Sequence, residues 1–290
     1  MKTFLYATDY SKNSVAALKY ALKLSLLMDA RLVVSHVLAY PVITEAMVLK
    51  ELPELQKSAL KANRVRLEEF CERHLGKEWK AMNLQIEPVE NMYVLEGILE
   101  IANKWHAELI ITGMRGESTV ADFLLGSTTK RLIKKAPCPI LAIPSDIRYA
   151  LPKTIVYATD FEEEDIYTIR KLTELAEPLQ AEIKVVHIVT KKDYSGEPEL
   201  EWFKDMLEEK VDYNRIEFEL LFSKDILETL RNYLSDVGAD MVVMLERKKS
   251  GFLKKWFHMD KVKKMESYGR IPLLSFNEAN QQIFHFSLSR

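Results

Sequence analysis

The chain has 290 residues, of which 48% are apolar and 29% are charged, the proportions of an ordinary soluble globular protein. Its formal net charge of −2 provides no electrostatic basis for binding nucleic acid or an anionic membrane surface, so neither is expected as a partner. Cys71 and Cys138 lack the spacing of a metal or redox site, and no apolar run approaches the ~18 residues that cross a membrane. The first residues show no signal-peptide pattern. We therefore expect a cytoplasmic protein.

Apolar runs alternate with amphipathic stretches along the first half of the chain. Continuous apolar runs, such as residues 109–111, are typical of strands that are covered on both faces. Strands that alternate with helices predict parallel βαβ units with right-handed crossovers. The expected strands are 3–8, 31–37, about 84–89, 108–112 and 139–143. The expected helices are 11–28, about 45–75, about 94–104 and about 125–135.

The second half repeats the first in order. The triplet Ala-Thr-Asp occurs at residues 7–9 and again at 158–160, each time after an apolar strand. His-Val at 36–37 is matched by His-Ile at 187–188, and both pairs of segments are 151 residues apart. Similar echoes follow up to a final strand at 271–276. Because the echoes keep their order, they indicate duplication rather than chance.

We therefore predict two domains, residues 1–147 and 151–290. Two repeats within one chain are expected to pack as a pseudo-two-fold pair, in the manner of a homodimer. The terminal strands, 139–143 and 271–276, are the expected meeting edges, because each would otherwise expose unpaired backbone groups. Whether the whole chain forms a further homodimer is left open.

A glycine-containing loop follows the expected strand 108–112. Gly113-Met114-Arg115-Gly116 is followed, after nine residues, by Gly126-Ser127-Thr128. Glycine lets backbone N–H groups converge on a phosphate, and a helix that begins near Gly126 adds free N–H groups and a positive dipole end. In an open parallel sheet, such a loop lies beyond the carboxyl ends of the strands, where ligands bind. The alternative is that these glycines only cap a helix and shape a turn.

Together with the Ala-Thr-Asp start, the His-Val strand end and the finish Ala-Pro-Cys-Pro-Ile at 136–140, this loop resembles the universal stress protein family, in two tandem copies. The resemblance implies that each copy is an α/β, Rossmann-like domain of the adenine nucleotide alpha hydrolase type with a five-stranded parallel sheet. It also implies that the first copy binds ATP, which we expect together with Mg²⁺. The implied nucleotide-binding residues are Ala7, Thr8, Asp9, Val37, Gly113, Met114, Arg115, Gly116, Gly126, Ser127 and Thr128.

The resemblance gives these residues separate parts. Asp9 would lie beside the adenosine, and Val37 would meet adenine largely through its backbone. The three glycines with Ser127 and Thr128 would hold the ribose and phosphates. Met114-Arg115 departs mildly from the family pattern, and Arg115 either touches phosphate or is solvated. Asp9 also fits a second role at the start of a helix, where its charge is favourable, and the two roles are compatible.

The second copy has lost the glycine loop. Alignment of the strand before it places Leu245 opposite Gly113, and Lys248 opposite Gly116. It also places His258 opposite Gly126, followed by Met259 opposite Ser127. We therefore expect nucleotide binding in the first half only.

Three functions remain open on the sequence alone. The leading one is a nucleotide-dependent regulatory module for stress, whose ligand state biases binding to a protein partner. A slow ATPase or autophosphorylating enzyme is the second, although no Walker lysine follows the glycines and no catalytic or metal-binding residue can be assigned. His36 is interpreted as a structural residue. The third is a scaffold that binds no nucleotide.

Overall fold

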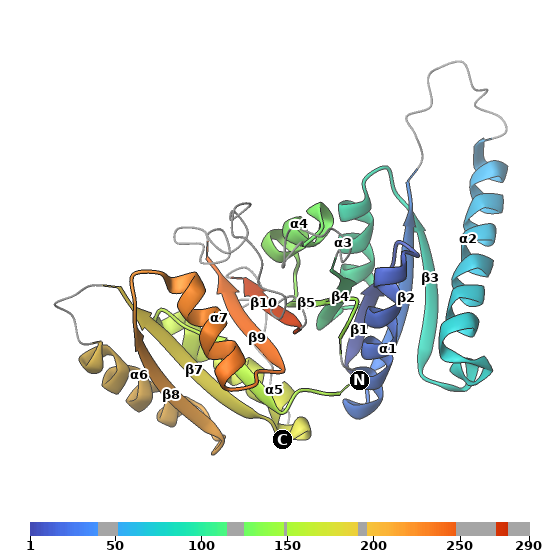
Figure 1. Ribbon diagram of the computed structural model, residues 1–290. Helices are drawn as coiled ribbons and strands as arrows, with labels where there is room; N and C mark the ends of the chain where they lie inside the picture. The colour runs from blue at the N-terminus through green and yellow to red at the C-terminus, as the bar shows by residue number, and fades with distance from the viewer. Residues whose placement is uncertain (40–51, 115–124, 148–149, 191–195, 248–270, 278–290) are drawn as a thin grey trace.

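The computed structural model describes residues 1–39, 52–114, 125–147, 150–190, 196–247 and 271–277. The two halves of the chain lie side by side, and their strands form one continuous sheet (Figure 1). The elements of the first half are β1 (Thr3–Ala7), α1 (Lys12–Leu27), β2 (Arg31–Leu38), α2 (Leu52–Leu75), the 3-10 helix η1 (Lys77–Ala81), β3 (Leu84–Glu90), α3 (Val94–Lys104), β4 (Leu109–Gly113), α4 (Ser127–Lys135) and β5 (Ile140–Ile143).

The second half repeats this alternation of strands and helices. Its elements are β6 (Thr154–Ala158), α5 (Glu163–Leu179), β7 (Glu182–Val189), α6 (Glu197–Lys210), β8 (Ile216–Phe222), α7 (Ile226–Asp236), β9 (Met241–Glu246) and β10 (Leu273–Asn277). The order of the strands in the sheet is β3-β2-β1-β4-β5-β10-β9-β6-β7-β8. Each half is therefore a parallel five-stranded sheet with the same internal order, read in opposite directions from the middle.

The halves join through their terminal strands. β5 and β10 pair antiparallel, with Leu274 opposite Leu141, whereas the other neighbouring strands of the described sheet pair parallel. Figure 1 shows β10, in red, next to β5 in the middle of the molecule. The expected meeting of the two terminal edges is confirmed. An antiparallel junction between two parallel sheets is the arrangement that a local two-fold axis produces.

Helices cover both faces of the sheet. Side chains alternate along β1, so that Phe4 and Tyr6 pack with α1 and α2, whereas Leu5 packs with α3 and α4. The first of these core layers also contains residues of α5 and α6, and the second contains residues of α7. Each layer therefore runs across both halves without a break.

The sequence predicted most element bounds within two residues. The helix expected over 45–75 is seen over 52–75, and residues 45–51 lie outside the described part of the chain. The 3-10 helix η1 was not expected. No helix in the described ranges is both long enough and apolar enough to cross a membrane. Cys71 and Cys138 are both buried free thiols, and burial raises the pKa of the Cys71 thiol to about 12.

Candidate functional site

A cavity of about 160 Å³ opens at the carboxyl ends of β1 and β4, which pair as far as Ala7 and Thr112. From β1 the chain proceeds to β2 on one side, and from β3 it crosses to β4 on the other. This point of reversal is where open α/β sheets bind ligands. The residues that line the cavity are Ala7, Thr8, Asp9, Ser11, Asn13, Ser14, Val94, Ile98, Thr112, Gly113, Met114, Gly126, Ser127, Thr128 and Thr129.

The structure brings most of the predicted residues to this one cavity. Ala7, Thr8 and Asp9 reach it from the end of β1, and Gly113 and Met114 reach it from the end of β4. Gly126, Ser127 and Thr128 reach it from the start of α4. Arg115 and Gly116 lie outside the described residues. Their roles in binding remain predictions.

Side chains hold the turn between β1 and α1. Thr8 Oγ1 accepts the Tyr10 N–H at 3.0 Å and donates to Ser14 Oγ at 3.1 Å. Asp9 Oδ1 accepts the Ser11 N–H at 3.0 Å, so Asp9 does lie at the helix start, while its side chain stays exposed beside the cavity. Tyr10 adopts the left-handed region, with φ of 62°, which the two flanking side-chain hydrogen bonds help to fix. Ser14 lines the cavity but was not among the predicted residues, and the only sequence signal for it was its place in the first turn of α1.

Both helices that begin at the cavity have uncapped N-termini. Neither α1 nor α4 has an acidic residue in its first turn; the N-cap Ser11 side chain of α1 makes no hydrogen bond to the helix backbone, and the N-cap of α4 is Gly126, which has no side chain. The first N–H groups of a helix have no partner within the helix, and its dipole is positive at that end. These two helix ends therefore favour an anion, and Asp9 is the acidic residue of the described lining.

Gly113 and Gly126 differ in what surrounds them. A Cβ on Gly113 would come within 3.1 Å of the Asn13 carbonyl oxygen and 3.3 Å of Ser14 Cα, so this glycine lets α1 approach β4 closely. A Cβ on Gly126 would meet no atom of the described residues within 4 Å. The φ of Gly126 is −58°, a value open to any residue. Neither backbone conformation nor packing among the described residues requires glycine at position 126.

Val37 does not belong to the cavity lining. Its side chain is 7% exposed, and its Cγ1 lies only 2.7 Å from where a Cβ on Gly97 of α3 would be. Its backbone is placed differently. The Ser35 carbonyl accepts the Thr8 N–H, and alternate residues of a parallel strand turn their N–H and C=O groups to the same neighbour. The backbone of Val37 therefore faces the space beyond the end of β1.

His36 lies on the other face of the sheet, in a polar cluster with α2. Its Nδ1 is 3.1 Å from Asn63 Oδ1, and the Tyr10 hydroxyl donates to the same oxygen at 2.8 Å. Arg66 covers the Tyr10 ring, with 4.2 Å between the guanidinium carbon and the ring centroid. Burial lowers the pKa of His36, and the nearby Arg66 adds to this effect against the opposing hydrogen bond to Asn63. These contacts agree with the interpretation of His36 as a structural residue.

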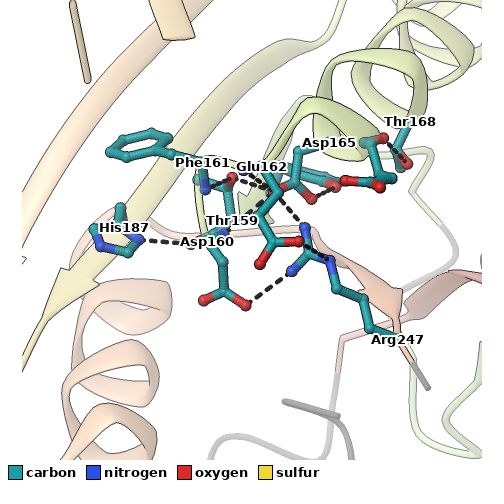
Figure 2. A network of polar contacts seen from close by, with 10 residues as sticks. Thr159, Asp160, Phe161, Glu162, Asp165, Thr168, His187 and Arg247 are labelled. Carbon is teal, nitrogen blue, oxygen red and sulfur yellow. Dashed lines mark hydrogen bonds and ion pairs between the residues drawn. The ribbon is translucent and has the colours of Figure 1, made fainter. Parts of the chain in front are cut away.

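At the corresponding point of reversal in the second half, between the carboxyl ends of β6 and β9, the cavity is only about 30 Å³. Arg247, which follows β9, extends into this place and is 8% exposed. Its guanidinium contacts Asp165 at 2.7 Å, Asp160 at 2.8 Å and Glu162 at 3.3 Å (Figure 2). A built-in cation thus occupies the region that is open in the first half.

Asp165 is the buried centre of this network. It accepts hydrogen bonds from the Tyr157 hydroxyl at 2.6 Å and the Thr159 hydroxyl at 2.8 Å, and it forms a capping box with Glu162 (Figure 2). With the 151-residue offset, Asp165 corresponds to Ser14, and this comparison of the repeats was the signal that could have revealed it. The first turn of α5 carries Glu163, Glu164 and Asp165, so it repels the anion that the start of α1 favours.

The described part of the lost loop agrees with the alignment. Leu245, opposite Gly113, is 4% exposed and packs in the core of the second half. Lys248, His258 and Met259 lie outside the described residues.

Comparison with known proteins identifies the family. A family model described as the universal stress protein family matches residues 1–144. A universal stress protein of Thermus aquaticus is 32% identical over 143 residues, which make up 98% of that protein and 49% of this chain. This chain belongs to the universal stress protein family.

Other universal stress proteins are also similar to this one. A protein of Methanocaldococcus jannaschii is 30% identical over 154 residues, covering 81% of that protein and 49% of this chain. A crystal structure from Archaeoglobus fulgidus matches 95% of this chain and 98% of its own, with a TM-score of 0.66 and 14% identity. The latter likeness concerns the fold, and it extends over both halves.

Proposed function

We propose that this universal stress protein binds ATP at the cavity of its first half only, and that the bound state regulates a stress response through a protein partner. The observation that carries the proposal is Gly126. It stands at the start of α4, a Cβ there would meet no atom of the described residues within 4 Å, and the φ of Gly126 is open to any residue. A ligand that approaches the backbone closely supplies the reason for glycine at this position.

Phosphate is the chemistry that suits this end of the cavity. The uncapped starts of α1 and α4 present N–H groups, and Ser127 and Thr128 add hydroxyl donors. No acidic side chain stands in either first turn to compete with the anion. The sugar and phosphates would lie here, between the two helix ends.

Adenine would lie toward β2. The backbone of Val37 turns its N–H and C=O past the end of β1, and such a pair of groups matches the donor and acceptor edge of adenine. Val94 and Ile98 of α3 add apolar surface to the cavity. Asp9, exposed beside the cavity, is placed to accept hydrogen bonds from the ribose.

Mg²⁺ fits this donor set as a companion of the nucleotide. Ser127 and Thr128, which line the cavity, have hydroxyl oxygens of the kind that Mg²⁺ takes as ligands. The phosphates would supply the other ligands, as is usual for this ion. Bound there, the ion would neutralise phosphate charge.

The second half is proposed to hold no triphosphate. Arg247 occupies the place that corresponds to the open cavity, and three acidic side chains in the first turn of α5 repel an anion. We also propose that the duplication defines units 1–147 and 151–290, and that the protein acts in the cytoplasm.

Calorimetric titration with ATP and MgCl₂ tests the binding, together with mass spectrometry of any small molecule released from the purified protein on denaturation. We expect one ATP per chain. If ATP is bound without measurable turnover, the regulatory module is supported over the slow ATPase or autophosphorylating enzyme. If ATP does not bind and no nucleotide is released on denaturation, the remaining function is that of a scaffold that binds no nucleotide.

A further inference from the structure

A residue of the second half supports the helix that faces the cavity of the first. Asn277, at the end of β10, donates from its side-chain amide to the carbonyl oxygens of Ile133 at 2.9 Å and Ala136 at 3.1 Å. Both acceptors lie at the C-terminal end of α4, whose N-terminal end forms part of the cavity wall. Asn277 is 3% exposed, so these hydrogen bonds are shielded from water.

The sequence of α4 leaves a vacancy that Asn277 fills. In an α-helix the carbonyl of residue 133 would accept from the N–H of residue 137. Residue 137 is proline, which has no N–H, and the helix ends before it. Ile133 and Ala136 are buried, so their carbonyls need a partner other than bulk water. The amide of Asn277 supplies both donors, and its partial positive charge suits the negative end of the helix.

The junction between the halves fixes the position of this amide. β10 pairs antiparallel with β5, with Ser275 opposite Ile140, and the same register places Asn277 beside the approach to β5 that follows α4. In the aligned repeats, in which Pro139 corresponds to Pro272, the residue that corresponds to Asn277 is Pro144. Pro144 has no side-chain donor. The first half therefore has no equivalent of this amide to offer to the second.

We infer that Asn277 is a positioning residue for the nucleotide site of the first half. Asn277 holds the C-terminal end of α4, so that the N–H groups at the N-terminal end of the helix, at Ser127, point into the cavity. The role in binding rests on the ATP site proposed above. The second half then contributes to a site that it does not itself contain, and this gives the degenerate copy a function.

Asn277→Asp tests the inference in the full-length chain, because it keeps the shape of the side chain but removes both N–H donors, and Asn277→Leu removes every side-chain donor. Asn277→Leu serves the same purpose if the buried carboxylate prevents folding. Ser275→Ala is the matched control, since Ser275 is 1% exposed on the same strand and its hydroxyl donates within β10, to the Phe276 carbonyl.

Hydrogen exchange without nucleotide comes first. Exchange of the α4 amides should accelerate in the Asn277 variant relative to the wild type and Ser275→Ala, while exchange in β1 and β4 stays unchanged. Equal exchange in α4 among the three proteins would overturn the support of α4 by Asn277, whether or not ATP binds.

Titration with ATP and with adenosine then tests the link to the site. Loss of the Asn277 amide should weaken ATP binding by roughly fivefold, equivalent to ~1 kcal/mol. Adenosine, which lacks phosphates, should lose less than about twofold. A general loss of stability would lower both affinities alike and would contradict a positioning role, as would unchanged ATP affinity. If the wild type itself binds no ATP, the proposed function fails, and the exchange measurement still decides whether Asn277 supports α4.

Discussion

Nη2 of Arg247 lies 2.7 Å from Oδ2 of Asp165, in the part of the second half that corresponds to the open cavity of the first. Asp165 is completely buried. The corresponding residue of the first half, Ser14, bears no charge and needs no counter-ion. At equivalent positions near the end of the first strand, the first half thus has a neutral hydroxyl, and the second half has a buried ion pair.

Removal of either partner of this pair should strongly destabilise the protein. Arg247→Met leaves the buried Asp165 carboxylate without its counter-ion, and Asp165→Ser leaves the guanidinium with only its partly exposed partners. Breaking a buried ion pair typically costs about 3–5 kcal/mol. Denaturation with urea would measure this cost. The double variant, which restores the serine of the first copy, should be much closer to the wild type than the sum of the singles, and additive losses would contradict the account.

Gly113 and Gly126 should respond differently to a single added methyl group. Gly113→Ala drives a Cβ against the backbone of Asn13 and Ser14, and overpacking of this kind costs about 1–3 kcal/mol. Gly126→Ala adds the same group where no atom of the described residues lies within 4 Å, and it should change the free energy of unfolding by no more than about 0.5 kcal/mol. Thermal and urea unfolding of the two variants would compare them. Equal losses would mean that the surroundings of the two glycines are not as described.

Acidification should destabilise the protein partly through His36. Because burial lowers its pKa in the folded state, the unfolded chain binds the proton more readily. The stabilising contribution of neutral His36 is therefore present above the unfolded pKa of about 6.5 and is lost as the pH falls below it. His36→Gln should show a shallower loss of unfolding free energy between about pH 7 and pH 5. An unchanged slope would contradict this, and His74→Gln is the comparison, since burial lowers the pKa of His74 as well.

Much of the architecture could be predicted from the sequence, because the buried strands are continuous apolar runs and because the repeats show them twice. The meeting of the terminal strands β5 and β10 followed from the same duplication, and the structure shows that they pair antiparallel. The glycine loop predicted which strand and helix ends would gather at one cavity. The loop pattern did not predict that Gly113 also has a packing role: its lack of a side chain lets α1 approach β4 closely.

Pairings between residues far apart in the chain were beyond the sequence. Arg247 meets a carboxylate 82 residues away, and Asn277 meets the Ile133 carbonyl 144 residues away. No local pattern marks either pair, because the first depends on how the elements of the second half pack together, and the second depends on how strands of the two halves meet in the sheet. The lack of an N–H at Pro137 leaves the Ile133 carbonyl without its helical donor, but it does not identify the residue that takes the donor's place.

The most direct test of the central claim is calorimetric titration of the wild type and Gly126→Val with ATP and MgCl₂ at matched salt. The wild type should bind one ATP per chain. The branched side chain should lower the affinity at least about tenfold, or ~1.4 kcal/mol, while unfolding stays close to that of the wild type. Ser127→Ala should cost less, since one neutral hydroxyl bond contributes about 0.5–1.5 kcal/mol. Two equivalent sites per chain, or unchanged ATP affinity in a folded Gly126→Val protein, would contradict a single nucleotide site at the start of α4.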